Sequence, residues 1–150
     1  MTKFYDDLKE GQKLEDLILE WILPKYPKSK RVSIKEYDID TFESLTIETK
    51  LDKRSQTTLN IAIEYSFRGS PSGIETTTAD WWVQGFHDKE WKIACAPLAV
   101  WKELCKNPLV TQRPGGDGYE TMNHIIPKEE MYKIEAIKIY PMPRKKRAVG

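Results

Sequence analysis

The alternation of hydrophobic and polar positions predicts one helix followed by several strands. Between Asp7 and Leu23 the apolar residues recur at helical spacing, and Pro24 ends this pattern. Residues 32–40, 45–51 and 60–67 alternate with a period of two, which is typical of half-buried strands. We therefore expect an α/β or α+β fold in which a central mixed β-sheet is flanked by helices.

The second half of the chain predicts shorter elements. They are two strands around a turn at Asp80–Val83 and Trp91–Ala94, a helix at Pro97–Lys106, a helical turn at Lys128–Tyr132 and a strand at Lys133–Tyr140. The glycine-rich stretch Thr111–Glu120 predicts a flexible loop. Because no repeat interrupts this order, we expect one domain over residues 1–140 and a basic tail over 141–150.

The strand at 45–51 carries the most informative polar residues. Its alternation places Glu48 and Lys50 on the same face. A hairpin register that sets Asp38 opposite Glu48 leaves Thr41–Leu45 as a connection of ordinary length. Two carboxylates and a lysine would then meet at one end of the sheet.

This set of side chains suits phosphodiester hydrolysis. Neighbouring carboxylates form the hard oxygen site that Mg²⁺ or Mn²⁺ prefers, and the metal can polarise a phosphoryl oxygen. The ammonium of Lys50 can act on the attacking water or on negative charge that develops at phosphorus.

Two further acids are candidate metal ligands. Glu15 lies at the margin of the apolar stripe of the first helix, where a carboxylate is costly unless it is paired or bound to a metal. It could therefore form an ion pair or act as a third ligand. Glu64 shares a strand face with Asn60 and Ala62, and it could join Glu48 at the metal or pair with Lys50 or a neighbouring arginine.

The ordered set of Asp38, Glu48–Lys50, Asn60–Tyr65, Gly69–Ile74 and Thr76–Trp82 resembles the PD-(D/E)XK nuclease superfamily, in particular a small phage-type endonuclease branch. The resemblance covers roughly residues 15–82, about half of the chain. The chain departs from the superfamily pattern at one position, and at another it leaves the choice of the first metal ligand open. Tyr37 stands where the superfamily has proline, and Asp40 shares a strand face with Asp38 as an alternative first ligand.

The resemblance implies a restriction-endonuclease-like core and a magnesium-dependent DNA endonuclease, with Mn²⁺ able to substitute. Branched or phage-related DNA would be the substrate. The residues implied in catalysis are Asp38, Glu48, Lys50 and Glu15, of which the three acids would bind the metal. A phage protein of this kind would act in the cytoplasm of a bacterial host, and cutting both strands at once would call for a homodimer, for which twofold pairing is the commonest solution.

Several polar side chains could contact the phosphate backbone. They are Lys53, Arg54, Ser72, Arg113 and the basic run Arg144, Lys145, Lys146 and Arg147. Each has a plainer interpretation as a solvated loop, turn or tail residue, because a net charge of +1 is not the signature of binding by bulk electrostatics.

Composition argues against several other classes of protein. A hydrophobic fraction of 39% argues against disorder, and no apolar run or leader-like segment predicts membrane insertion, so we expect an intracellular protein. Cys95 and Cys105 are not in a metal-binding motif, and zinc is improbable. Two alternatives to an enzyme are a catalytically inactive nuclease-like module that binds nucleic acid, and a structural or inhibitory protein whose Asp38–Glu48–Lys50 set is an exposed salt-bridge network.

Overall fold

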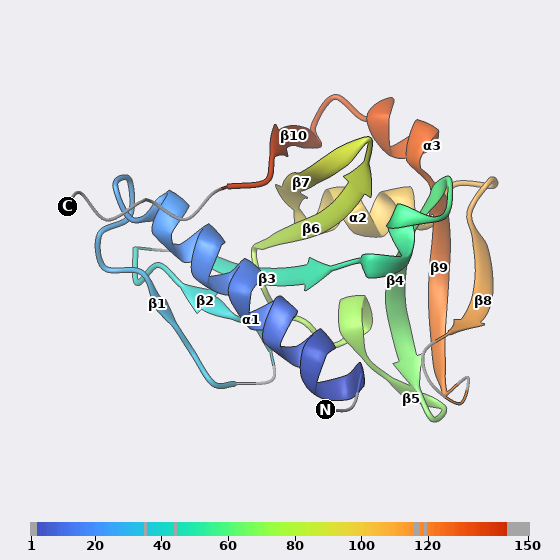
Figure 1. Cartoon of the computed structure of the whole chain (residues 1–150), viewed down its shortest axis with the longest axis horizontal. Helices are drawn as coiled ribbons and strands as arrows, with labels where there is room; N and C mark the ends of the chain where they lie inside the picture. Colours follow the sequence, from blue (N-terminus) through green and yellow to red (C-terminus); the bar gives the residue numbers. More distant parts are fainter. Residues whose placement is uncertain (1–2, 35, 44, 116–117, 119, 144–150) are drawn as a thin grey trace.

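The computed structural model describes residues 3–34, 36–43, 45–115, 118 and 120–143 (Figure 1). Its helices are α1 (Lys3–Ile22), α2 (Leu98–Leu104) and α3 (Lys128–Tyr132), with 3₁₀ turns η1 (Lys53–Gln56) and η2 (Gly73–Glu75). Its strands are β1 (Lys30–Arg31), β2 (Ile39–Asp40), β3 (Thr46–Leu51), β4 (Asn60–Phe67), β5 (Ser70–Pro71), β6 (Trp81–Asp88), β7 (Glu90–Pro97), β8 (Thr111–Gly115), β9 (Thr121–Pro127) and β10 (Lys138–Pro141). Within these ranges, no helix combines the length and the apolar character needed to span a membrane.

The strands form two sheets. A six-stranded sheet has the order β1-β2-β3-β6-β7-β10, and it is mixed because β3 runs parallel to β6 while the other neighbours are antiparallel. A four-stranded antiparallel sheet has the order β5-β4-β9-β8. The fold is thus α+β with a mixed central sheet and few helices, and this coarse prediction is confirmed.

Helix α1 packs against one face of the six-stranded sheet. Leu14 and Ile18 are buried against Ile47 of β3 and Val83 of β6. The approach is close at Gly85 of β6, where an added Cβ would lie only 3.0 Å from the Leu14 side chain. The absence of a side chain at Gly85 therefore leaves room for Leu14 against β6.

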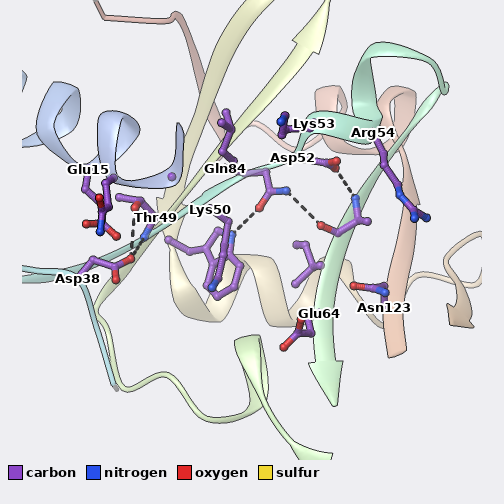
Figure 2. Close-up of a pocket in the computed structure, with 16 residues that line it drawn as sticks. Glu15, Asp38, Thr49, Lys50, Asp52, Lys53, Arg54, Glu64, Gln84 and Asn123 are labelled. Atoms are coloured by element: carbon purple, nitrogen blue, oxygen red, sulfur yellow. Dashed lines mark hydrogen bonds between the residues drawn. The ribbon is translucent and has the colours of Figure 1, made fainter. Parts of the chain in front are cut away.

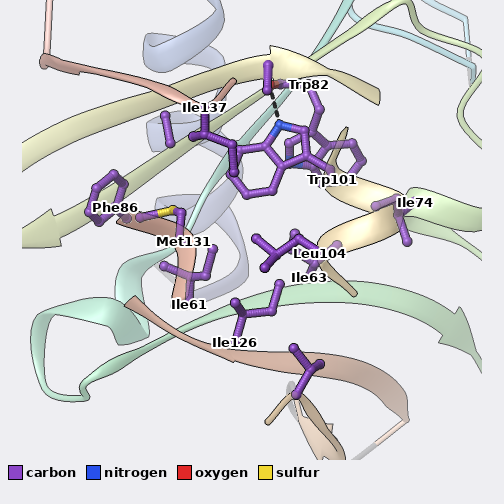
Figure 3. Packing of buried hydrophobic residues seen from close by; sticks show 13 residues of the cluster. Ile61, Ile63, Ile74, Trp82, Phe86, Trp101, Leu104, Ile126, Met131 and Ile137 are labelled. Atoms are coloured by element: carbon purple, nitrogen blue, oxygen red, sulfur yellow. Dashed lines mark hydrogen bonds between the residues drawn. The ribbon is translucent and has the colours of Figure 1, made fainter. Parts of the chain in front are cut away.

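The other face of this sheet packs against the four-stranded sheet (Figure 3). Trp82 and Phe86 of β6 meet Ile61 and Ile63 of β4 in this core. Trp101 of α2 is fully buried there, and its Nε1 donates a hydrogen bond to the carbonyl of Trp82 at 3.0 Å. Strand β3 is consequently covered by α1 on one face, while Lys50 on its other face stays half exposed.

Some predicted elements are confirmed. The strand at 60–67 is β4 and the helical turn at 128–132 is α3, and β2 and β3 form the expected hairpin over the 41–45 connection. The first helix begins four residues earlier than predicted, and the predicted strands at 80–83 and 91–94 extend into the longer hairpin β6–β7.

Three predicted elements are wrong. The segment 32–40 forms only the short β2, because side chains such as Ser33 and Ile34 are exposed and no second sheet face buries them. The predicted loop at 111–120 begins with strand β8, whose place at the sheet edge tolerates Pro114. The last strand starts at Lys138 instead of Lys133, because backbone bonds close a turn between Met131 and Ile137.

Candidate active site

A cavity of about 500 Å³ lies beside the C-terminal half of β3, beyond the point where β2 stops pairing with it (Figure 2). It is lined by Glu15 of α1, by Asp38, by Thr49–Arg54, by Ala62–Glu64 of β4, by Trp82 and Gln84 of β6 and by Asn123 of β9. The predicted catalytic segments of α1, the hairpin and β3 thus meet at one open strand edge.

Asp38 is fixed to β3 across the hairpin. Its Oδ2 accepts hydrogen bonds from the backbone N–H of Thr49 at 2.8 Å and from the Thr49 hydroxyl at 3.2 Å. Asp40 has a different role, because its carboxylate accepts from the N–H of Phe42 at 2.7 Å and from the Tyr37 hydroxyl at 3.5 Å. Only Asp38 of the two lines the cavity, which favours it as the candidate ligand.

Glu48 is buried, with 7% of its surface exposed. Its Oε1 lies 3.5 Å from Nζ of Lys50, and its Oε2 has no hydrogen-bond partner among the residues that the structure describes. Burial raises the pKa of Glu48 to about 7, with a further increase from Asp38, while the nearby ammonium of Lys50 opposes the shift. A buried carboxylate oxygen without a partner is costly, so this atom is the one for which the fold gives no structural purpose.

Lys50 extends from the same face of β3 as Glu48, as the alternation predicts. The register explains this, because Glu48 pairs with Trp82 and Lys50 pairs with Gln84 in the parallel neighbour β6. The Lys50 side chain remains 47% exposed and lines the cavity. Lys50 therefore lies between the buried Glu48 carboxylate and the open cavity.

Glu15 forms the ion pair that was one of its two predicted alternatives. Its Oε2 accepts from Nη2 of Arg31 at 2.6 Å, and Nη1 of the same guanidinium reaches Asp16 at 3.0 Å. Burial and then the charge of Asp38 raise the pKa of Glu15, whereas Arg31 lowers it. Glu15 is thus close to Asp38 of the hairpin and is also ion-paired. Its partner Arg31 was missed, because it ends a basic, turn-rich linker over residues 26–31 that predicts either a phosphate contact or simple solvation.

Glu64 lies apart from Glu48. Its Oε2 accepts from the Ser72 hydroxyl at 2.7 Å, so two predicted site residues bind each other across the β4–β5 connection. The carboxylates whose charge raises the pKa of Glu48 are Asp38 and Glu15. Glu64 lines the cavity from β4, away from Asp38 and Glu15, as Figure 2 shows.

Two carboxylates, Asp38 and Glu48, could hold a divalent cation. Over the described ranges, no group of three or more His, Cys, Asp or Glu side chains is positioned to hold a metal ion. Mg²⁺ in particular needs only one or two protein carboxylates, because water and substrate phosphate complete its shell. The unpartnered Oε2 of Glu48 beside Asp38 therefore fits such an ion, with Glu15 outside a preformed ligand set.

The loop after β3 is held by buried polar groups. Asp52 accepts from the N–H of Ala62 at 2.7 Å and from the N–H of Ser55 at 3.2 Å. Lys128 of α3 donates to the carbonyls of Ser55 at 2.7 Å and Thr58 at 2.8 Å. These contacts fix the 3₁₀ turn that carries Lys53 and Arg54 at the cavity.

Sequence reasoning missed both anchors of this loop. The position of Asp52, three residues before Ser55 at the start of a helical turn, is a capping signal that could have been recognised. Nothing local predicts that Lys128 reaches back across more than seventy residues of chain. The remaining predicted phosphate contacts are separate, since Arg113 lies on β8 outside the first cavity, and Arg144, Lys145, Lys146 and Arg147 lie outside the described residues.

Comparison with known proteins leaves the chain unassigned, because no family model and no curated protein matches it. The candidate function depends on the arrangement of side chains. The interpretation of Asp38, Glu48 and Lys50 as an exposed salt-bridge network requires an exposed Glu48, and the burial of Glu48 contradicts it.

Proposed function

We propose that this protein is a divalent-metal-dependent endonuclease that hydrolyses phosphodiester bonds of DNA, with Mg²⁺ as its ion and Mn²⁺ as a substitute. The observation that carries the proposal is the buried Oε2 of Glu48, which lacks a partner while Asp38 and Lys50 lie beside it. A buried carboxylate oxygen without a hydrogen-bond partner lowers the stability of the fold, so a ligand that binds this oxygen would stabilise the protein. A restriction-endonuclease-like core is part of the same proposal.

Asp38 and Glu48 would hold the ion, which when bound supplies a Lewis acid for a phosphoryl oxygen of the substrate. Thr49 keeps the Asp38 carboxylate oriented through two hydrogen bonds, so the ligand is preorganised before DNA arrives. Glu48 is buried in a low-dielectric environment, so its attraction for a cation is stronger than it would be in water.

Lys50 is the group that faces the reacting phosphate in this proposal. In the reaction, water adds to phosphorus and one ester oxygen leaves, so that one strand end carries a phosphate and the other a hydroxyl. The ammonium stabilises the negative charge that builds on the phosphoryl oxygens, and it can hold the attacking water. Its contact with Glu48 at 3.5 Å positions it without closing the cavity.

Arg54 and Lys53 would bind the phosphates that flank the cleaved bond, because their loop is fixed beside the cavity. Cutting both strands of a duplex or a junction in one encounter requires a second site, which a homodimer would supply.

A nicking assay tests the proposal directly. Supercoiled plasmid should be converted to open circles in Mg²⁺ or Mn²⁺ and should stay intact in EDTA. Calorimetry should detect divalent-ion binding to the wild type, and Asp38→Asn and Glu48→Gln should lose both ion binding and nicking. A wild type that binds DNA but neither binds a divalent ion nor nicks would instead be a nuclease-like binding module.

A further inference from the structure

The four-stranded sheet has one buried face and one open face. Ile61 and Ile63 of β4 and Ile126 of β9 point into the core between the sheets. Ala62 and Ile125 lie on the opposite face, because successive side chains of a strand point to opposite sides. This open face is adjacent to the candidate active site, since Ala62 also lines the first cavity.

A second cavity of about 470 Å³ lies on the open face. The cross-strand row Ala62, Ile125 and Thr111 forms a mainly apolar floor. The next row contributes the amide of Asn123 and the guanidinium of Arg113. An apolar floor with a few polar groups, at a volume within the usual range of about 300–1,000 Å³, is typical of a small-ligand site.

The two cavities share their boundary. Arg54 and Asn123 line both of them, and Figure 2 shows these side chains at the end of the first cavity opposite Asp38. Among the residues that the structure describes, neither Arg54 nor Arg113 forms an ion pair. One available cation thus lies between the cavities and another lines the second.

The side chain of Asn123 is kept at this boundary by its neighbours. Its Nδ2 donates to the Thr121 hydroxyl at 3.2 Å. A Cβ at Gly115, opposite Thr121 on β8, would lie 2.7 Å from the same nitrogen. The glycine therefore makes the room that the amide occupies, and the amide lines both cavities.

We propose that the second cavity binds one unpaired nucleotide of the DNA, so that the preferred substrate has a junction or flap with single-stranded nucleotides next to the cleaved bond. This inference rests on the proposed nuclease function. Arg54 binds the phosphate between the cavities and Arg113 the phosphate beyond, which matches cations to a backbone that runs through both. The apolar floor takes the face of the base, and Asn123 meets its hydrogen-bonding edge.

A paired nucleotide does not fit this site. Its base edge is occupied by its partner and its faces by the stack, so only an unpaired or extruded base can contact a concave apolar floor. A site for one unpaired nucleotide therefore lets the protein distinguish branched DNA from duplex without a long contact surface.

The test measures DNA binding in EDTA, where cleavage cannot interfere. Fluorescence anisotropy compares a duplex, the same duplex with a single-stranded flap, and that flap with its first unpaired base removed. The wild type should bind the flap about tenfold more tightly than the duplex. Removal of the base should abolish this preference, and an unchanged affinity for the abasic flap would overturn the proposal.

Two variants on one strand sharpen the result. Thr111→Trp fills the second cavity and should reduce flap affinity to that of the duplex, with duplex binding unchanged. Gln112→Trp is the matched control, because residue 112 is the exposed neighbour on the opposite face of β8 and does not line the cavity. Equal flap preference in both variants would contradict a base-binding role.

The failure of the nuclease function has a separate signature. A protein that prefers the flap in EDTA but never nicks DNA in Mg²⁺ retains the nucleotide site and loses the proposed catalysis. A protein that nicks normally but shows no base-dependent preference retains the catalysis and loses the nucleotide site.

Discussion

Two groups of buried or half-buried polar residues meet at β3 and at the loop that follows it, and they differ in how fully their hydrogen-bonding atoms are satisfied. The loop cluster, which consists of Asp52, Ser55 and Lys128, is joined by hydrogen bonds of 2.5–3.2 Å to backbone and to itself. The acidic cluster, which consists of Glu15, Asp38 and Glu48, contains the unpartnered Oε2 of Glu48.

The contrast is sharpest between Asp52 and Glu48, two buried carboxylates four residues apart. Burial raises the pKa of both. Backbone N–H groups counteract this at Asp52, while Glu48 has only the ammonium of Lys50 to offset burial and two neighbouring acids. Asp52 is therefore explained by folding, whereas the described part of the fold supplies no hydrogen-bond donor to Oε2 of Glu48.

The largest expected effect is a loss of catalysis without a loss of metal binding. It would support the distinction between the acidic cluster and the loop cluster. Lys50→Ala should reduce the nicking rate by about 10²–10³-fold, because it removes charge stabilisation in the transition state and leaves both metal ligands in place. Plasmid nicking and calorimetry measure the two properties separately. Lys102→Ala, at an exposed position on α2, is the control, and normal nicking by Lys50→Ala would refute the assigned role.

In the loop cluster, replacing the lysine should lower the stability of the protein. Lys128→Met leaves the carbonyls of Ser55 and Thr58 without their donor and should lower the free energy of unfolding by about 3 kcal/mol. Urea denaturation measures this. Lys133→Met, which breaks only the pair of an exposed lysine with Glu130, should cost less than about 1 kcal/mol. Equal costs would mean that Lys128 is not a structural anchor.

In the acidic cluster, neutralisation should stabilise the metal-free protein. The pKa of Glu48 is about 7 when folded against an ordinary value of 4.5, so its contribution to stability is complete below pH 4.5 and is lost as the pH rises through 7. Glu48→Gln should therefore be about 2 kcal/mol more stable than wild type at pH 8 in EDTA, and similar to it at pH 4.5. Urea denaturation at the two pH values measures the difference.

The matched substitution in the loop cluster should have the opposite sign. Asp52→Asn presents an amide N–H to one of two backbone donors, so it should lose about 1–3 kcal/mol at pH 8. If Asp52→Asn and Glu48→Gln change stability in the same direction, the distinction between the two clusters fails.

The smallest effect is expected from the C-terminal tail, which belongs to neither cluster. Deleting residues 143–150 should leave unfolding and divalent-ion binding unchanged. It should weaken DNA affinity and reduce the dependence of log K on log salt by about one for each lost phosphate contact. Titrations at several salt concentrations measure the slope, and an unchanged slope would assign the basic run to solvent.

Local periodicity predicted the parts of the site that lie within one strand or one hairpin. The common face of Glu48 and Lys50 and the 41–45 connection follow from alternation and loop length alone. The alternation could not predict how the second sheet packs beside this site, because that sheet is assembled from β4, β5, β8 and β9, which are spread over residues 60–127. For the same reason the burial of Glu48 and the reach of Lys128 were outside what the sequence pattern could predict.

The glycine at position 85 has a consequence for the acidic cluster, although it carries no functional group. Glu15 follows Leu14 on α1, and a Cβ added at Gly85 would lie 3.0 Å from the Leu14 side chain and 3.1 Å from that of Leu51. A single methyl group there would oblige these two side chains to give by a few tenths of an ångström, next to the residue that α1 contributes to the acidic cluster. The packing beneath Glu15 is thus adjustable from inside the core, by a substitution that introduces neither charge nor hydrogen bond.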